Sequence, residues 1–483
     1  MKIDSLRSKI INCFLGKAAG GTLGAPYEGF AGPLNLIFYN PIPQEMLPND
    51  DLDLQILSAC YLSKLEKVEI NHKIFKDMWL NHVTFCFDEY NIALRNLKAG
   101  ILPPRSGSYD NFFVNGLGAA IRSEIWAALA PGNPHLAAQY AYEDACIDHD
   151  GEGIYAAQFL AALESKAFAS SNISEIIEAG LAEIPAESQI AMAVKDTLNW
   201  CGEIRDPLAI REKIMQQYGS DNFTDVVMNI PFIILGLILG EGDFGKSVCM
   251  AVNCGEDADC TGATLGAIMG ILGDIPAEWL KPIGNKCVLS KEIINISAPE
   301  TLEDLTDMIL NIKERLGEYS CQKDEINTYE FKLTAKCGIY SPWCAADPGK
   351  YSPKLPENYE IKTFNGFFNS IPSGLIDKNS LYLMEFSFEI FEERDVIIMF
   401  NTPEISQLYL DNQFLFARDG GRMTPSFHRC PPNQSKVVHL TKGVHKILAG
   451  IAKYTGKEQL EWVLGVGDVK NKLYLTEKEC KFF

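Results

Sequence analysis

Paired cysteines, long apolar runs and positive charge are all scarce in this sequence of 483 residues. Its fourteen cysteines are scattered without a CxxC pair, which argues against a zinc ribbon or a disulfide framework. The longest apolar run, 230–239, is too short to span a bilayer, and no secretory apolar segment follows Met1. The sequence therefore predicts a cytoplasmic protein with reduced thiols and no membrane partner.

Basic residues are outnumbered, with 43 Lys and Arg against 63 Asp and Glu and a net charge of −20. Proteins that bind nucleic acid neutralise its phosphates with Lys and Arg, so we expect no nucleic-acid partner. The chain is also longer than one ordinary hydrophobic core accommodates, which favours two domains. Its oligomeric state is left open by the sequence.

Acidic residues and glycines are concentrated in the stretch 253–270. Three carboxylates fall within four residues: Glu256, Asp257 and Asp259. Three glycines follow at helical spacing: Gly262, Gly266 and Gly270. Such a helix can be approached closely by another helix, and rigid carboxylates at its start are suitable ligands for a hard cation such as Mg²⁺. The alternative is that Asp259 only caps the helix and its neighbours favour the helix dipole.

The same glycine spacing occurs in the helix expected over residues 6–24, at Gly16, Gly20 and Gly24. We expect these two helices to pack with their backbones close together. Pro26 ends the first helix, so Glu28 is expected in the loop that follows.

A second helix is expected to open at residues 48–53, with Asn49 or Asp50 as its N-cap. Capping explains any one acid there, but it accounts less well for Asp50, Asp51 and Asp53 together. Helical periodicity continues over 73–99 and again over about 275–318.

Two polar loops and one charged segment are further candidates for a site. The loops span 105–111 and 115–122, and the second enters a helix whose exposed N–H groups suit an anionic or hydroxyl-rich ligand. The segment 148–153 holds one histidine and three carboxylates, which are more often structural or solvated than catalytic. Zinc is not expected there, because no second pair of ligands accompanies Cys146 and His149.

Residues 240–247 match the phosphate-loop pattern GxxxxGK[ST]. Two acids inside that loop would repel phosphates, and the alternation of strands and helices typical of phosphate-loop proteins is absent from the sequence. We therefore reject a phosphate loop.

Short alternating segments replace the helical pattern after 322–325, and turn residues separate them, which favours a β-sandwich. Six strands are expected: 329–333, 381–391, 396–400, 406–410, 437–440 and 446–451. The phrases at 408–412 and 440–445 resemble jelly-roll or galactose-binding-like accessory domains of glycoside hydrolases. The predicted fold class is multidomain, with an all-α bundle over 1–320 followed by a smaller all-β sandwich over 330–483.

Four motifs within residues 8–285, taken together and in order, resemble the ADP-ribosylglycohydrolase family, which has a compact all-α fold. They are the helix Gly16–Gly24 with Glu28, the run Asn49-Asp50-Asp51, the segment from Asn115 through Arg122 to His149, and Gly242–Phe244 with Gly255–Cys260. The resemblance implies that Asp50, Asp51, Asp257 and Asp259 bind magnesium, with Asn49 and Cys260 at the positions of two hydroxyl ligands.

Three departures from the family pattern bear on the number of ions. The family's early aspartate is Gly21 here, and its hydroxyl ligands are replaced by the amide of Asn49 and the soft thiol of Cys260. The resemblance therefore implies Mg²⁺, with Mn²⁺ as an alternative, in a site for one or two ions.

The resemblance further implies a hydrolase that cleaves a bond at C1 of a ribosyl unit, with a small-molecule or protein-linked substrate. Glu28 is the first candidate for the catalytic carboxylate, and Glu256 and Glu152 are alternatives. The candidates for substrate contact are Ser108, Tyr109, Asn115, Gly116, Asp148 and His149. Two other functions remain open: hydrolysis of another furanosyl glycoside or a nucleoside, and binding of ADP-ribose or a sugar without catalysis.

Overall fold

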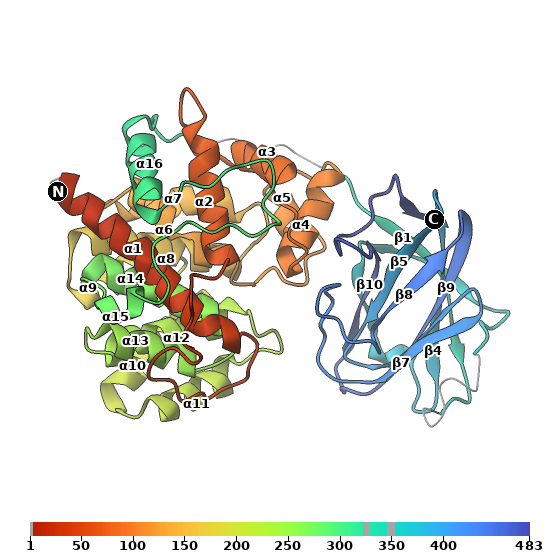
Figure 1. Ribbon diagram of the computed structural model, residues 1–483. Helices are drawn as coiled ribbons and strands as arrows, with labels where there is room; N and C mark the ends of the chain where they lie inside the picture. The colour runs from red at the N-terminus through yellow and green to blue at the C-terminus, as the bar shows by residue number, and fades with distance from the viewer. Residues whose placement is uncertain (1–2, 322–327, 345–352) are drawn as a thin grey trace. The chain divides into compact units, whose positions relative to one another are not determined.

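The computed structural model describes residues 3–321, 328–344 and 353–483 (Figure 1). Its chain forms two compact units, a helical one and one built mainly of antiparallel strands, which confirms the expected fold class. The composition change at 322–325 lies outside the described residues. The units do not follow a single boundary near 320–330, because residues 84–102 and 109–112 belong to the second unit.

Among the described residues of the first unit, the regular elements are all helices. Its helices are α1 (Ile3–Gly24), η1 (Ala25–Tyr27), α2 (Asp50–Ser63), α3 (His72–His82), α5 (Arg105–Ser108), η2 (Ala120–Arg122), α6 (Glu124–Leu129), α7 (Pro134–Ala145), α8 (Glu152–Ala169), α9 (Ile173–Leu181), α10 (Gln189–Glu203), α11 (Pro207–Tyr218), α12 (Val226–Leu239), α13 (Phe244–Asn253), α14 (Ala258–Leu272), α15 (Ala277–Leu280) and α16 (Leu302–Glu314).

Helices α1 and α14 pack backbone against backbone, as the glycine spacing predicts (Figure 1). A Cβ atom on Gly16 would lie 2.1 Å from the carbonyl oxygen of Gly266, and one on Gly20 would lie 1.9 Å from that of Gly262. The contacts run antiparallel, so Gly24 at the end of α1 meets Asp259 at the start of α14. This packing brings the loop after α1 to the acidic start of α14.

The expected helix over 73–99 is wrong in its middle, because α3 ends at His82 and α4 (Asp88–Lys98) begins five residues after Val83. Val83 is extended and forms a bridge with Ile293, which stops the helix although the apolar pattern continues. Helix α4 then belongs to the second unit. The helical expectation over 275–318 likewise holds only for α15 and α16.

The second unit contains eleven strands among its described residues. They are β1 (Lys332–Tyr340), β2 (Glu360–Asn365), β3 (Phe368–Pro372), β4 (Leu381–Ile390), β5 (Arg394–Asn401), β6 (Ile405–Leu410), β7 (Gln413–Asp419), β8 (Ser435–Leu440), β9 (Gly443–Ala452), β10 (Gln459–Asp468) and β11 (Cys480–Phe482), with a short helix η3 (Ser373–Leu375).

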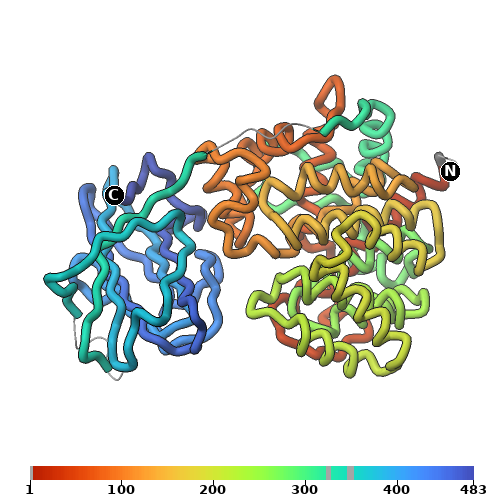
Figure 2. Tube along the Cα trace, turned by 180° about the vertical axis from the view of Figure 1, so that it is seen from behind, coloured from red at the N-terminus to blue at the C-terminus, as the bar shows by residue number. Residues whose placement is uncertain are grey.

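These strands form two antiparallel sheets. Figure 2 shows the chain trace of these strands from behind, in blue-green to blue. One sheet has the order β2-β1-β4-β9-β6-β7 with β11 beside β4, and the other the order β3-β10-β5-β8. Phe386 of the first sheet and Phe400 and Trp462 of the second share one buried core, as in a β-sandwich. The first strand starts at Lys332, three residues after the expected start at 329, and continues past 333 to Tyr340.

Helix α4 is fixed to the strands through Arg95. Its guanidinium forms a 2.8 Å ion pair with Asp110 and lies about 5 Å from the ring centres of Phe331, Phe367 and Tyr474. Asp110 also accepts hydrogen bonds from the backbone N–H groups at the start of β3. The helix is therefore part of the packing of the second unit.

The apolar run 230–239 lies inside α12, and Asp243 caps α13. Residues 240–247 therefore form the connection between two helices and the first turn of the second. This confirms the rejection of a phosphate loop, which requires a strand before it. None of the described helices combines the length and apolar character that crossing a bilayer requires.

Candidate metal centre and active site

The two aspartate pairs meet where α2 and α14 begin. Asn49 is the N-cap of α2, since its Oδ1 accepts a 2.9 Å hydrogen bond from the backbone N–H of Asp51. Its Nδ2 lies 3.5 Å from Oδ2 of Asp259. The amide of Asn49 thus joins the two helix starts, and its oxygen is engaged in capping.

A donor group for one cation is present in this cluster. Three side chains, those of Asp51, Asp259 and Cys260, each offer one possible ligand atom, and these three atoms lie within 4.8 Å of one another. Asp51 and Asp259 are only 1% and 6% exposed, and Oδ2 of Asp51 and Oδ1 of Asp259 have no hydrogen-bond partner among the described residues. Buried carboxylate oxygens without partners are costly, and a divalent ion would satisfy both.

Helix capping does not explain the acids of α14. The residue at its N-cap is Asp257, not Asp259, and the Asp257 side chain makes no capping hydrogen bond. The backbone N–H of Asp257 instead donates to Oδ1 of Asn229 on α12. Since capping satisfies neither carboxylate, the interpretation as a cation site is the stronger one.

The electrostatics of the cluster also favour a cation. Burial, together with neighbouring carboxylates, raises the pKa of Asp50 and Asp259 well above the ordinary value. Burial and Glu28 raise the pKa of Asp257 to about 8. Burial raises the pKa of the Cys260 thiol as well. Carboxyl groups whose charge is disfavoured in this way would be stabilised as carboxylates by a divalent ion.

Glu28 lies beside the aspartates, on the exposed side of the cluster. It follows η1 in the loop after α1, and its charge raises the pKa of Asp50, Asp257 and Asp259. Backbone bonds hold this loop against the start of α14: the N–H of Gly29 donates to the carbonyl of Glu256 at 2.8 Å. Glu28 therefore combines access to solvent with a fixed position.

The backbone of Glu256 connects the start of α14 to the loop that carries Glu28. Its φ is +59°, and its N–H donates at 2.6 Å to the carbonyl of Phe30, while its side chain is buried. Next to it, a Cβ atom on Gly255 would lie 2.5 Å from the backbone nitrogen of Gly32. These contacts make Glu256 a support for the Glu28 loop.

Arg211 clamps the same two segments, a role that the sequence does not indicate. The residue is 5% exposed, and its guanidinium donates to the carbonyl oxygens of Cys254, at 2.8 Å, and of Ala31. In the sequence, Arg211 is one charge in a polar helix and resembles a solvated surface residue. Only its contacts with Cys254 and Ala31 in the folded chain distinguish Arg211 from a surface residue.

Lys17 of α1 is also absent from the sequence-based candidates. It is completely buried, with Nζ 2.8 Å from Oε1 of Glu124 and 3.4 Å from Oδ1 of Asp51. Although burial lowers the pKa of Lys17, the carboxylates of Glu124 and Asp51 raise it above its ordinary value. A positive charge therefore lies on the inner side of the acidic cluster.

Glu152 has a structural position that argues against catalysis. Its two carboxylate oxygens accept the backbone N–H groups of Gln189 and Ile190, at 2.9 and 3.0 Å. Glu152 thus satisfies the first donors of α10, together with the N-cap Ser188. The expectation that Glu152 is an alternative catalytic acid is not supported, because both oxygens bind a helix start.

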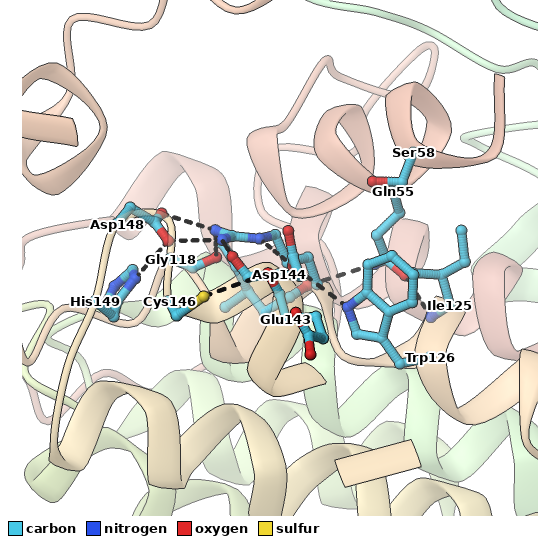
Figure 3. Close-up of polar contacts among 12 residues, drawn as sticks. Gln55, Ser58, Gly118, Ile125, Trp126, Glu143, Asp144, Cys146, Asp148 and His149 are labelled. Atoms are coloured by element: carbon cyan, nitrogen blue, oxygen red, sulfur yellow. Dashed lines mark hydrogen bonds and ion pairs between the residues drawn. The ribbon is translucent and has the colours of Figure 1, made fainter. Parts of the chain in front are cut away.

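Asp148 and His149 are completely buried and lie beside Asp144 and Gly118 (Figure 3). Asp148 receives two hydrogen bonds, of 2.7 and 3.0 Å, from the guanidinium of Arg122, which also binds the carbonyl of Gly118. Burial opposes this charge, but Arg122 and His149 lower the pKa of Asp148 below its ordinary value.

The ring of His149 lies 2.9 Å from Asp148 and against Gly153, with no exposed surface. Asp148 and His149 therefore fix the 115–122 segment through Arg122. A direct substrate contact, which the sequence suggested, is not open to these buried side chains.

The other candidates for substrate contact are distributed differently. Asn115 is half-buried in the first unit, and its carbonyl accepts the N–H of Val226 at the start of α12. Gly116 is buried, and Ser108 is exposed at the end of α5. Tyr109 belongs to the second unit, where its hydroxyl accepts a 2.8 Å hydrogen bond from the backbone of Phe331. That bond gives Tyr109 a structural role in the second unit.

The fold and the acidic centre define a helical domain in which carboxylates from distant helix starts lie close together. The sequence model of the ADP-ribosylglycohydrolase family matches residues 2–317. The chain therefore belongs to the ADP-ribosylglycohydrolase family, and it is in the broad sense a glycohydrolase of the ADP-ribosyl type.

Individual relatives are distant. Over 299 residues the chain is 26% identical to an uncharacterized protein of Archaeoglobus fulgidus. The aligned region covers 58% of this chain and 93% of that protein. A solved ADP-ribosylglycohydrolase-related protein complex matches with 20% identity and a TM-score of 0.44, over 65% of this chain and 99% of that one. A β-glucosidase from Kluyveromyces marxianus matches 28% of this chain and 16% of its own, with 15% identity and a TM-score of 0.20.

Proposed function

We propose that the chain is a Mg²⁺-dependent glycohydrolase that hydrolyses a bond at C1 of a ribofuranosyl unit in an ADP-ribosyl substrate. The observation that supports this most is the convergence of Asp51 and Asp259. Each is buried, and each has one carboxylate oxygen without a hydrogen-bond partner among the described residues.

The residues fit a hard cation. Asp51 and Asp259 would hold it with the two unpartnered oxygens, and Asp50 and Asp257 would add negative charge around them. Cys260 is a poor ligand for magnesium because its sulfur is soft. When bound, the ion supplies positive charge that orients the ribose hydroxyls and stabilises negative charge that develops on the substrate. Mn²⁺ has the same ligand preference and is an alternative.

Glu28 would perform the proton transfer. Its position beside the aspartates and on the exposed side of the cluster gives its carboxylate access to water. As the oxygen of a water molecule bonds to C1, Glu28 takes a proton from that water. The bond between C1 and the leaving group breaks, and the leaving group keeps the electron pair and takes up the proton that Glu28 removed from the water.

A second candidate function is the binding of ADP-ribose or a sugar without hydrolysis. It is favoured by Gly21, which has no carboxylate, and by the thiol of Cys260 at a hydroxyl position. Hydrolysis is favoured by the four aspartates and Glu28, so we place it first. A furanosyl glycoside or a nucleoside is the alternative substrate class.

The test is turnover of a substrate panel. The full chain is incubated with ADP-ribosyl-arginine and ADP-ribosyl-serine peptides, free nucleosides and furanosyl glycosides, each with Mg²⁺, with Mn²⁺ and with EDTA. We expect metal-dependent release of ADP-ribose from a peptide. Tight binding of ADP-ribose without turnover of any compound would establish the binding function instead, and turnover that EDTA leaves unchanged would exclude the metal.

A further inference from the structure

A buried lysine lies directly beneath the acidic cluster, and it is held by more than one partner. Nζ of Lys17 is 2.8 Å from Glu124 and 3.4 Å from Asp51, and all three side chains are at most 1% exposed. A lysine is rarely buried unless carboxylates compensate its charge, because desolvation of the ammonium is costly. Its presence in the glycine-rich helix α1 therefore requires an explanation.

Glu124 is anchored from its other side. Its Oε2 accepts a 2.8 Å hydrogen bond from Nε2 of Gln55. Oε1 of Gln55 in turn accepts the backbone N–H of Ile125 (Figure 3). Gln55 also donates to the backbone carbonyl of Asp51, one turn earlier on α2. These bonds connect α1, α2 and α6 and fix the ammonium of Lys17 in position.

The two carboxylate oxygens of Asp51 have different surroundings because Lys17 contacts only one of them. Oδ1 faces the ammonium, whereas Oδ2 has no hydrogen-bond partner among the described residues. Asp51 therefore has one oxygen left for a metal ion, and Asp259, with its unpartnered Oδ1, has one as well. Together with Cys260 they form one group of possible ligands in the described part of the chain.

Position 21 adds no carboxylate to the cluster. A Cβ atom on Gly21 would lie 3.0 Å from Nδ2 of Asn49, so the amide of Asn49 lies directly against this position. The inner side of the cluster thus has a fixed cation, Lys17, and no additional acid.

We propose that Lys17 is a positioning residue that acts as a permanent cation in this centre and limits it to a single divalent ion. Its ammonium occupies one oxygen of Asp51 and leaves the other for the metal ion between Asp51 and Asp259. This inference rests on the proposed metal-dependent function and decides between one ion and two.

The test is the stoichiometry of Mn²⁺ binding to the full chain, measured by the electron paramagnetic resonance signal of free Mn²⁺. We expect one Mn²⁺ per chain for the unmodified protein, a measurement that needs no variant. The variant K17M/E124Q removes one positive and one negative charge together, which avoids leaving Glu124 unpaired. We expect it to bind a second Mn²⁺, because both oxygens of Asp51 become available.

The variant E124Q alone is the matched control, since it keeps the ammonium and should still bind one ion. Circular dichroism checks that each variant is folded. Two ions in the unmodified protein, or one ion in both the unmodified protein and folded K17M/E124Q, would overturn the role of Lys17 while leaving the metal-dependent function intact. No Mn²⁺ bound at all would overturn both.

Discussion

Nδ2 of Asn49 lies 3.5 Å from Oδ2 of Asp259, although 210 residues separate them in the chain. This contact joins the start of α2 to the start of α14 and places Asp51 and Asp259 in one donor group. The contact is possible because α1 packs against α14 through glycines, which carries the segments that follow α1 toward the start of α14.

Replacing Asp259 by Asn should weaken Mn²⁺ binding at least about a hundredfold, because one of the two unpartnered carboxylate oxygens loses its charge. The same change should raise the melting temperature of the metal-free protein, since a buried and poorly compensated acid is removed. Calorimetric titration and thermal melts measure the two effects. Glu66→Gln, at an exposed acid, is the control, and equal Mn²⁺ affinity in both variants would contradict the assignment of Asp259.

Replacing Glu28 by Gln should lower kcat by about 10²- to 10⁴-fold, the usual contribution of a general base, with little change in Mn²⁺ affinity. Glu152→Gln is the matched comparison, because this carboxylate caps α10. It should lower the free energy of unfolding by about 1 kcal/mol and leave the kcat of the folded protein unchanged. A larger loss of kcat in Glu152→Gln than in Glu28→Gln would reverse our assignment.

Replacing Gly20 by Ala should destabilise the protein by more than about 3 kcal/mol, because the new Cβ would lie 1.9 Å from the carbonyl oxygen of Gly262. Gly202→Ala is the control in a helix where a Cβ meets no atom within 4 Å. It should stabilise the protein by about 0.5 kcal/mol. Denaturant unfolding measures both, and equal effects would argue against close packing of α1 on α14.

The metal-free protein should lose stability as the pH rises from about 4 to 8. Burial raises the pKa of Asp257 to about 8 and that of Asp53 to about 7, so the folded state binds more protons than the unfolded state in this range. Each such group lowers the free energy of unfolding by up to about 1.4 kcal/mol per pH unit. Melting temperatures in EDTA should therefore fall between pH 5 and 8, and saturating Mn²⁺ should reduce the fall. A metal-free melting temperature that rises over this range would contradict the prediction.

Replacing Cys260 by Thr should tighten Mg²⁺ binding by about tenfold, because a hydroxyl oxygen suits magnesium better than a thiol sulfur. Cys260→Ala removes the sulfur without adding an oxygen and serves as the control. Calorimetric titration with Mg²⁺ compares the three proteins. Equal affinity in all of them would show that the side chain at position 260 does not face the ion.

Local patterns predicted the features that depend on nearby residues. The glycine spacing at Gly16 and Gly20, the helix end before Pro26 and the cap at Asn49 could be read from the sequence, because each follows from sterics or hydrogen bonds within a few residues. The order of the acidic motifs, through the family resemblance, indicated which carboxylates belong together.

Features that depend on tertiary contacts could not be read in this way. Arg211 and Lys17 look like ordinary charges until their buried partners are known. Glu152 resembled a catalytic acid because its position against the start of α10, 37 residues away, has no local signal. The break after Val83 arises from its pairing with Ile293. Strand β10 was missed because glycines interrupt its alternation.

Helix α4 precedes the strands by more than two hundred residues, yet it shares their unit through Arg95 and Asp110. A gene truncated after residue 321 would therefore still encode Arg95, whose side chain would lose Phe331, Phe367 and Tyr474. Such a fragment would expose the surface of α4 that these rings cover in the full chain, and we expect it to aggregate. Separating the two halves for expression requires excising α4 as well, with a short linker in its place.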